Sequence, residues 1–404
     1  MKLLHSASQI VDYRGNQIED LLRDLVAIPS YESERAVADL LEQRLSAQNI
    51  PFERRDLGNG RQNVVARVGN GPRSLILHSH MDTVPPTALN VQWDSDPLQL
   101  RYDDGRLYGL GAADTKSSLS AMLCVFETLA KYRDELSSEI VLMAVGGEEI
   151  GGLGSKAEVA NGVNADAIVV GEPTNLSIMI GHKGVVRMDL TVWGKAAHAS
   201  RPDLGNNAIS LMAEAVRAID EFHATLQNRN SPLYSTPSVC ATTINGGQAL
   251  NVVPESCTVS LDRRIVPEEF DIGVGPEVYE TELEKVLSTC RPDGRTLNYS
   301  LDLVRYIPPA ATHPSEPLVQ IAQQAFSSVT GTDEAYRGFE ACCDMGHFSS
   351  GAGIPGIICG PGSLEQAHQA NEFVTRVELH QSLKIYSEIV LRWLQYSRIG
   401  RLPE

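Results

Sequence analysis

The alternation of short apolar runs with segments of helical period is the feature that most constrains the fold of this chain. Strands that are apolar along their whole length are buried on both faces, as in a parallel sheet covered by helices. Four such runs occur in the first half, NVVAR, SLILH, IVLMAV and AIVV at residues 63–67, 74–78, 140–145 and 167–170, and helical spacing occurs at 36–48 and 117–132. The first half therefore predicts an α/β architecture with a mostly parallel sheet.

The pattern changes near residue 184. Residues 185–192 alternate as a half-buried antiparallel strand does. An amphipathic helix at 207–222, alternating strands at 238–244 and 257–264, and a second helix at 277–287 follow. This β-α-β-β-α order is that of a smaller, ferredoxin-like α/β domain inserted into the larger one. We predict two domains, 1–183 with 298–404, where helices at 317–329 and 378–396 resume the first pattern, and 184–297.

Composition excludes several classes of protein. The 404 residues contain 34 Lys and Arg against 51 Asp and Glu, a net charge of −17, which disfavours binding to nucleic acid or to an anionic membrane surface. The chain has no run of about 18 apolar residues, the length that a membrane-spanning helix needs. Seven cysteines without regular spacing suit a reducing compartment, and the first residues do not resemble a signal peptide. We therefore expect a soluble cytoplasmic protein.

Histidine and carboxylate side chains follow the apolar runs at the point where each strand should end. His80 and Asp82 follow SLILH, Glu148 and Glu149 follow IVLMAV, and Glu172 follows AIVV. In open α/β sheets ligands gather at the carboxyl ends of the strands. Asp82 is placed to hydrogen-bond the imidazole nitrogen of His80 that does not face a metal ion.

Two glycine-rich turns carry further candidates, Asp114 in GLGAAD and His368 in GPGSLEQAH. GLGAAD has the start of a dinucleotide-binding loop, but Asp114 replaces its last glycine and no acidic ribose partner is evident. His78 and His80 also form an HxH pair, which some barrel metallohydrolases carry on their first strand. That fold needs eight strand–helix repeats, and the inserted domain argues against it.

The combination of these residues is more informative than any one of them. Mixed histidine and carboxylate ligands suit zinc, cobalt or manganese. Five ligands with one shared carboxylate can hold two ions about 3.5–4 Å apart. One carboxylate would then remain as a general base.

Six segments in this order resemble the M20 metallopeptidases, in the ArgE/DapE/carboxypeptidase group. They are LILHSHMDTVP, YGLGAADTK, GGEEIGG, VVGEPT, HASRP and GPGSLEQAH, and together they span nearly the whole chain. The resemblance implies a catalytic domain (1–183 and 298–404), an inserted lid or dimerisation domain (184–297) and two divalent metal ions, zinc first, with cobalt or manganese as alternatives. It assigns His80 and Glu172 to one ion, Glu149 and His368 to the other, and Asp114 to both, with a cis peptide bond after Asp114.

The resemblance also implies the remaining roles. Glu148 would be the general base that activates the attacking hydroxide between the ions, Asp82 would orient His80, and His198 would stabilise the oxyanion from the partner subunit of a homodimer. Asn251 and Arg264 would bind the substrate carboxylate, with Gly338 lining the pocket. Arg263 is then expected at the surface.

Substrate identity is less constrained than chemistry. The segments QAHQANEF and NVVPESC resemble acetylornithine deacetylases most, which favours N-acyl amino acids as substrates. Desuccinylase, carboxypeptidase, aminoacylase and dipeptidase activities are the alternatives within the family. Two departures from the family pattern concern the segments beside the ligands: Thr115-Lys116-Ser117 replaces Met-Lys-Gly, and Asn371 stands where Asp is commoner. Two alternatives from other classes are a non-catalytic metal- or ligand-binding protein and a thiol hydrolase that uses Cys342 or Cys343.

Overall fold

The computed structural model describes residues 9–10, 14–87, 92–270, 274–290, 294, 296–333 and 335–402. The chain divides into two compact units. The first comprises Met1–Gly181, Ala311–Phe339 and Cys343–Glu404, and the second comprises His182–Ala310 and Glu340–Cys342. The boundary expected at 298 differs from this division, because the strand that follows it pairs within the second unit.

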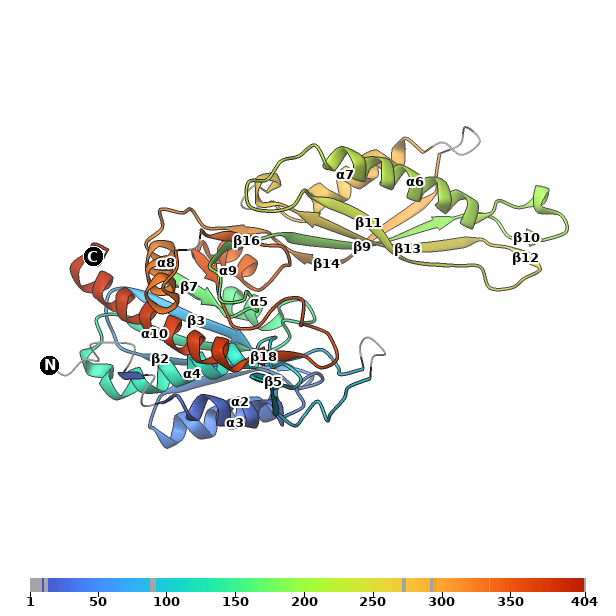
Figure 1. The fold of residues 1–404 in the computed structure, drawn as a ribbon. Coiled ribbons are helices and arrows are strands. Elements are labelled where there is room, and N and C mark those ends of the chain that lie inside the picture. The colour runs from blue at the N-terminus through green and yellow to red at the C-terminus, as the bar shows by residue number, and fades with distance from the viewer. Residues whose placement is uncertain are drawn as a thin grey trace. The chain divides into compact units, whose positions relative to one another are not determined.

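A mostly parallel nine-stranded sheet forms the centre of the first unit (Figure 1). Its order is β1-β2-β6-β3-β7-β17-β8-β15, with β16 paired to β8. The central strands β6, β3, β7 and β17 run parallel, whereas β1, β2 and β8 are antiparallel to their neighbours. The strands are β1 (Phe52–Gly58), β2 (Arg61–Val68), β3 (Ser74–His80), β6 (Glu139–Val145), β7 (Ala167–Val170), β8 (Met179–His182), β15 (Ala310–Ala311), β16 (Arg337–Phe339) and β17 (Gly356–Ile358).

Helices cover both faces of this sheet, which explains why β3, β6 and β7 are apolar almost throughout. Side chains of a strand point alternately to its two faces. In β3, His78 contacts Phe348 of α9 on one face, and Ser79 contacts Thr115 beside α4 on the other. The helices are α2 (Gln17–Val26), α3 (Arg35–Ala47), α4 (Lys116–Leu129), η1 (Ala130–Glu135), α5 (Leu153–Ala160), α8 (Pro317–Thr330), α9 (Met345–Ala352) and α10 (Arg376–Ile399).

A small three-stranded sheet lies next to the start of α10. Its order is β18-β5-β4, with bounds Phe373–Thr375, Arg106–Tyr108 and Arg101–Asp103. Thr375 and Glu378 form a capping box that fixes the first turn of α10. The sheet therefore joins the segment before α10 to the segment that leads to Asp114.

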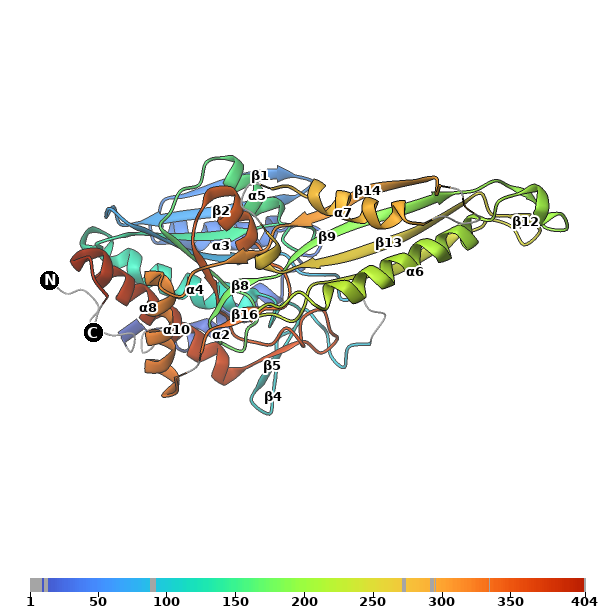
Figure 2. The ribbon, with the colours of Figure 1, turned by 90° about the horizontal axis from the view of Figure 1, so that it is seen from above.

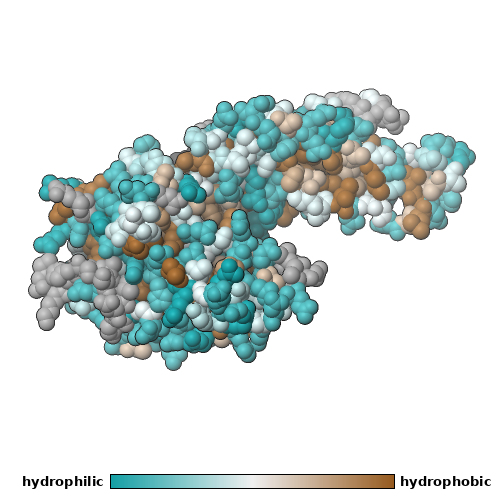
Figure 3. All heavy atoms as spheres, in the orientation of Figure 1, coloured by the Kyte–Doolittle hydropathy of each residue, from teal (hydrophilic) through white to brown (hydrophobic). Residues whose placement is uncertain are grey.

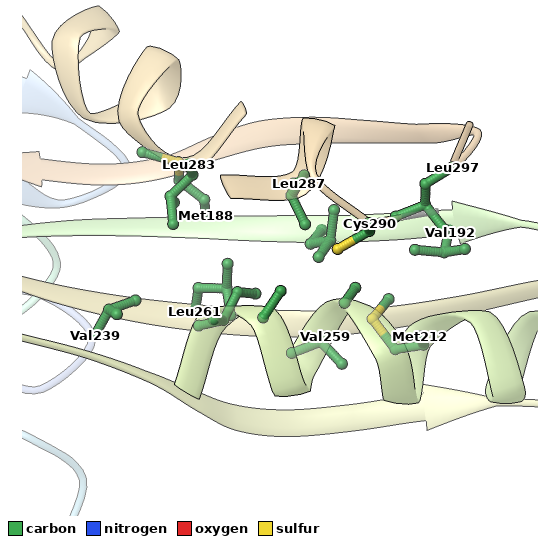
Figure 4. Close-up of a cluster of buried hydrophobic side chains, with 14 of the residues drawn as sticks. Met188, Val192, Met212, Val239, Val259, Leu261, Leu283, Leu287, Cys290 and Leu297 are labelled. Carbon is green, nitrogen blue, oxygen red and sulfur yellow. The ribbon is translucent and has the colours of Figure 1, made fainter. Parts of the chain in front are cut away.

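The second unit has the element order β9–α6–β11–β13–α7–β14 and an antiparallel sheet of order β11-β13-β9-β14, which is a ferredoxin-like arrangement (Figure 2). Helix α6 packs on β9, β11 and β13, and α7 packs on α6. Met188, Met212 and Leu283 belong to the apolar cluster between the sheet and these helices (Figure 4). The elements are β9 (Gly184–Trp193), β10 (Ala197–His198), η2 (Pro202–Leu204), α6 (Ala208–Leu226), β11 (Ser238–Gly246), β12 (Val252–Val253), β13 (Ser256–Ile265), η3 (Pro267–Glu269), α7 (Glu277–Ser288) and β14 (Tyr299–Ile307).

The second unit interrupts the first between two paired strands. β8 and β15 are neighbours in the large sheet, and the main-chain N–H of Thr312 donates to the carbonyl oxygen of Ile180 at 2.7 Å. Among the described residues, no helix is both long enough and apolar enough to cross a membrane.

Candidate metal centre and active site

The carboxyl ends of three parallel strands bring the polar segments of the sequence to one edge of the large sheet. β3 ends at His80, β6 leads into the glycine-rich segment with Glu148 and Glu149, and β7 is followed by Glu172. Because β3 pairs in parallel with both β6 and β7, these ends lie side by side. This edge therefore brings together potential metal-binding side chains from three separate segments.

Two clusters of potential metal ligands share one carboxylate. His80, Asp114 and Glu172 form the first cluster, and Asp114, Glu149 and His368 form the second, with the ligand atoms of each within 4.8 Å of one another. Oδ1 of Asp114 lies 3.0 Å from Nε2 of His80, while its Oδ2 lies 3.5 Å from Nε2 of His368. The two oxygens of Asp114 thus face different clusters, which is the arrangement that a bridging carboxylate requires.

The electrostatics of these residues fit a cationic occupant. Burial and neighbouring carboxylates raise the pKa values of Glu148 and Glu172 well above the usual range, and burial is also the largest cause that raises the pKa of Glu149. Burial disfavours the imidazolium of His80, but its contacts with Asp114 and Asp82 outweigh this and raise its pKa. So many carboxylates without bound cations oppose one another's ionisation. Divalent ions with a preference for histidine and carboxylate ligands would relieve this repulsion.

Asp82 makes more contacts than the sequence suggested. Nδ1 of His80 donates to the main-chain oxygen of Asp82 at 3.0 Å, and lies 3.5 Å from its carboxylate. This tautomer leaves Nε2 of His80 as the ligand atom. The two carboxylate oxygens of Asp82 accept the main-chain N–H groups of Glu148 and Glu149 at 3.2 and 3.1 Å. Asp82 therefore holds the glycine-rich segment after β6 as well as facing His80.

Glu148 is half-buried and belongs to neither ligand cluster of the described residues. Because its carboxylate is not needed as a metal ligand, it is available to accept a proton. The peptide bond between Asp114 and Thr115 is cis, as the resemblance implied.

Buried residues to which the family motifs give no role lie around the clusters. Glu372 is buried and its carboxylate accepts main-chain N–H groups from the loop that carries Asp114. On the α5 and α9 face of the sheet, the hydroxyl of Ser155 donates to Asp344 at 2.7 Å and lies 3.0 Å from Nε2 of His78. The sequence signals for these residues were weak. Glu372 is an acidic residue shortly after His368, and Asp344 comes directly before an apolar helical segment. Neither pattern distinguishes a buried carboxylate from an exposed one.

The departure at Asn371 has a structural counterpart. The side-chain oxygen of Asn371 accepts the main-chain N–H of Asp94 at 2.9 Å, and its amide donates to the Asp94 carboxylate at 3.0 Å. An aspartate at 371 would set two carboxylates against each other, so Asn371 suits the presence of Asp94.

The second unit carries three of the remaining candidates. His198 is exposed on β10, directly across from Val252 of β12, and the main-chain oxygen of Asn251 accepts the N–H of Ala199 at 2.9 Å. His198 and Asn251 are thus neighbours on one ribbon. Arg264 is half-buried on β13 and donates to Asp262 at 2.6 Å. Gly338 lies in β16 of the first unit, half-buried, and its role stays a prediction.

The expectation that Arg263 lies at the surface is wrong. Its side chain is 1 % exposed and donates to Glu269 at 2.8 Å and to Glu282 at 3.2 Å. Alternation along β13 places Arg264 on the opposite face of the sheet, so Arg263 points toward α7, where these two glutamates balance its charge.

The thiol alternative is not supported by the environment of its two cysteines. Burial raises the pKa of Cys343 well above the usual range, and burial is also the largest cause that raises the pKa of Cys342. Burial likewise lowers the pKa of His347 to about 4, which leaves it a weak base. A thiol that stays protonated at neutral pH is a poor nucleophile.

Known proteins share both the sequence and the fold of this chain. Residues 76–392 match the family described as "Peptidase family M20/M25/M40". The chain is 27% identical to "Acetylornithine deacetylase" of Proteus mirabilis, over 92% of this chain and 95% of that protein. It is 26% identical to "Probable succinyl-diaminopimelate desuccinylase" of Staphylococcus epidermidis, over 93% and 97%. An M20 family metallo-carboxypeptidase from Sulfolobus solfataricus has the same fold, with a TM-score of 0.76, 18% identity and coverage of 95% and 99%.

Fold, site and relatives together define a class of protein: a metal-dependent hydrolase that acts on amide bonds. The chain belongs to peptidase family M20/M25/M40. The mixed α/β fold and the family predicted from the sequence are thereby confirmed.

Proposed function

We propose that this protein hydrolyses the amide bond of N-acyl amino acids with two divalent ions held by the two ligand clusters. Zinc is the favoured metal, and cobalt and manganese are the alternatives. The observation that carries the proposal is the shared position of Asp114 between the clusters, with Glu148 in neither. The names of the deacetylase and desuccinylase relatives support an acyl amino acid as substrate. A dipeptide or a peptide with a free carboxyl end is the second candidate, supported by the fold of the carboxypeptidase.

His80 and Glu172 would hold one ion, Glu149 and His368 the other, and Asp114 both. When bound, the ions would supply Lewis acidity that lowers the pKa of water and polarises a carbonyl group. Glu148 would accept the proton of the attacking water and return it to the leaving nitrogen. Asp82 would keep both Glu148 and the ligand Glu149 in place through their main-chain N–H groups.

The tautomer of His198 supports a role as hydrogen-bond donor. Its Nδ1 accepts the main-chain N–H of Ser200 at 3.1 Å and lies 2.7 Å from the Ser200 hydroxyl. A neutral imidazole that accepts at Nδ1 carries its proton on Nε2, so Nε2–H can donate to a developing oxyanion. Arg264 offers the planar guanidinium that suits a substrate carboxylate, and Asn251 an amide next to His198.

A homodimer through the second unit completes the proposal. β11 is an edge strand of its sheet and is exposed over most of its length. Unpaired edges of this kind favour pairing with another chain. Ile209, Ile244 and Leu250 are large apolar side chains exposed on this unit, and Figure 3 shows apolar patches on its surface. In such a dimer His198 would serve the metal centre of the partner subunit.

The test is amine release from a panel of N-acyl amino acids and dipeptides, before and after chelation and with zinc, cobalt or manganese restored. Release that needs metal and is strongest with one acyl amino acid would support the proposal and name the substrate class. Strongest release from dipeptides would favour the second candidate. Full occupancy by two ions without turnover of any panel member would contradict both.

A further inference from the structure

The carboxylate of Glu372 is joined to the loop that carries Asp114. Glu372 is 2 % exposed. Its Oε1 accepts the main-chain N–H groups of Ala113 at 2.8 Å and Asp114 at 2.9 Å, and its Oε2 accepts that of Gly111 at 2.8 Å. Its main-chain oxygen accepts a fourth hydrogen bond, from the N–H of Gly109 at 3.0 Å. One residue therefore receives four hydrogen bonds from residues 109–114.

Such a contact is costly unless every bond is made. A buried carboxylate loses several kcal/mol of hydration, and its stabilisation here comes from main-chain dipoles that converge on it. Each N–H left without an acceptor in this buried loop would carry its own desolvation cost. The position of the loop is therefore tied to the position of Glu372.

The segment that carries His368 meets the same loop at its other end. A Cβ atom on Gly362 would lie 2.8 Å from Cβ of Ala113, so Gly362 packs closely on the Asp114 loop. His368 lies between Gly362 and Glu372 in the sequence and has φ of 61°. The segment 362–372 is thus fixed to residues 109–114 at both ends, with His368 between the two contacts.

The two ligand clusters differ in how their members are held. His80 is the last residue of β3 and Glu172 follows β7, two strands that pair directly, and Asp114 contacts His80 at 3.0 Å. His368 lies in the loop between β17 and β18, flanked by the contacts at Gly362 and Glu372. The start of this loop is also bonded to the segment after Glu172, where the main-chain N–H of Asn175 donates to the carbonyl oxygen of Gly362 at 2.7 Å. Asp114 belongs to both clusters, but the other two members of the first cluster lie at strand ends, whereas in the second cluster His368 depends on contacts between loops.

We propose that Glu372 is a positioning residue that sets the separation of Asp114 and His368, and so affects the ion held by Glu149 and His368 more than the ion held by His80 and Glu172. This inference rests on the ligand assignment of the proposed function. Glu372 would touch neither the ions nor the substrate. Its effect would pass through the main chain of Ala113 and Asp114.

The test is Glu372→Gln, with metal-free protein titrated with Co²⁺ by equilibrium dialysis and by the visible absorption of bound cobalt. The amide keeps one accepting oxygen but sets an NH₂ group against at least one main-chain N–H donor. Because Asp114 is assigned to both ions, we expect the first equivalent to be weakened only slightly. The second should bind about 10–100-fold more weakly, the range typical of partners that orient ligands. The absorption band added by the second equivalent should be lost at matched cobalt concentration.

Glu127→Gln is the matched control. Glu127 is also a buried carboxylate, but it lies near the far end of α4 and is bonded to Arg14 and Arg44. This variant should lose stability and still bind both equivalents as the wild type does. If Glu372→Gln does not fold, Gly362→Ala perturbs the other contact and should also weaken the second equivalent.

Equal binding of both equivalents by Glu372→Gln and the wild type would overturn the inference, and so would equal weakening of both equivalents. A wild type that binds fewer than two ions would instead contradict the proposed function. The two failures are therefore distinguishable in one titration.

Discussion

The carboxylate of Asp82 accepts the main-chain N–H of Glu149 at 3.1 Å, so a residue after β3 fixes a ligand segment after β6. Its other oxygen accepts the N–H of Glu148 at 3.2 Å. The segments that follow two neighbouring strands are therefore coupled through main-chain hydrogen bonds. This coupling adds to the orientation of His80 and makes Asp82 sensitive to substitution.

Asp82→Asn should lower kcat/KM or metal affinity about 10–100-fold. The amide group has one accepting oxygen and would set its NH₂ against a main-chain donor. The measurement is kcat/KM together with metal content. Asp166→Asn is the control, because Asp166 accepts the N–H of Ser74 at 2.8 Å at the opposite end of β3. Equal effects of the two variants would contradict the special role of Asp82.

Glu148→Gln should reduce kcat by about 10²–10⁴, the range for loss of a general base, while both ions still bind. The reason is that Glu148 belongs to neither ligand cluster. Glu149→Gln is the comparison, and it should weaken the binding of one ion. Metal content by mass spectrometry and single-turnover rates separate the two results. Loss of metal in Glu148→Gln would reassign it as a ligand.

Chelation should abolish activity and added divalent metal should restore it, whereas thiol alkylation at neutral pH should leave activity intact. Burial keeps Cys343 protonated and therefore unreactive, since burial raises its pKa. The measurement is residual activity after EDTA and, separately, after iodoacetamide. Inactivation by iodoacetamide that substrate prevents would revive the thiol alternative.

Stability should fall in acid partly through Glu19, which joins α2 to α10. Burial opposes its ionisation, but hydrogen bonds from His380 and Arg376 outweigh burial and lower the pKa of Glu19. Its contribution is therefore complete above the unfolded-state pKa of about 4.3 and is lost as the pH falls through the lower folded-state value. Glu19→Gln should cost about 1 kcal/mol of unfolding free energy at pH 7 and progressively less below about pH 4.

Urea denaturation between pH 3 and pH 7 checks this prediction. Asp20→Asn is the control, because Asp20 is an exposed neighbour on the same helix whose partner Arg23 is exposed too. A difference between wild type and Glu19→Gln that does not shrink in acid would refute the assignment.

Two inactive variants should complement each other if His198 serves the partner's site. His198→Ala and Glu148→Gln should each be inactive as homodimers. A mixed dimer would contain one site with both intact residues, so co-expression should restore up to about half of the activity per mixed dimer. Activity of purified tandem-tagged dimers is the measurement. A mixed dimer as inactive as its parents would place His198 in its own subunit's site or outside catalysis.

The sequence was sufficient to predict the position of residues that follow a recognisable strand. His80, Glu149 and Glu172 follow uninterrupted apolar runs, so the sheet edge that collects them was predictable from strand ends alone. Glu372 and Arg263 were not, because their burial depends on distant partners: main-chain N–H groups of residues 109–114 for one, Glu269 and Glu282 for the other. β14 was placed in the wrong unit for a similar reason, since its partner β9 lies more than one hundred residues earlier.

The pairing of β8 with β15 has a consequence for how such a chain could arise and be altered. The two points where the second unit leaves and re-enters the first are adjacent strands, with Thr312 bonded to Ile180. A gene segment for residues 183–309 could therefore be exchanged for a short turn without cutting any strand of the large sheet. All members of the two ligand clusters lie outside that segment, whereas His198, Asn251 and Arg264 lie within it. Divergence of the insertion would therefore keep the proposed metal site and change the residues proposed to contact the substrate.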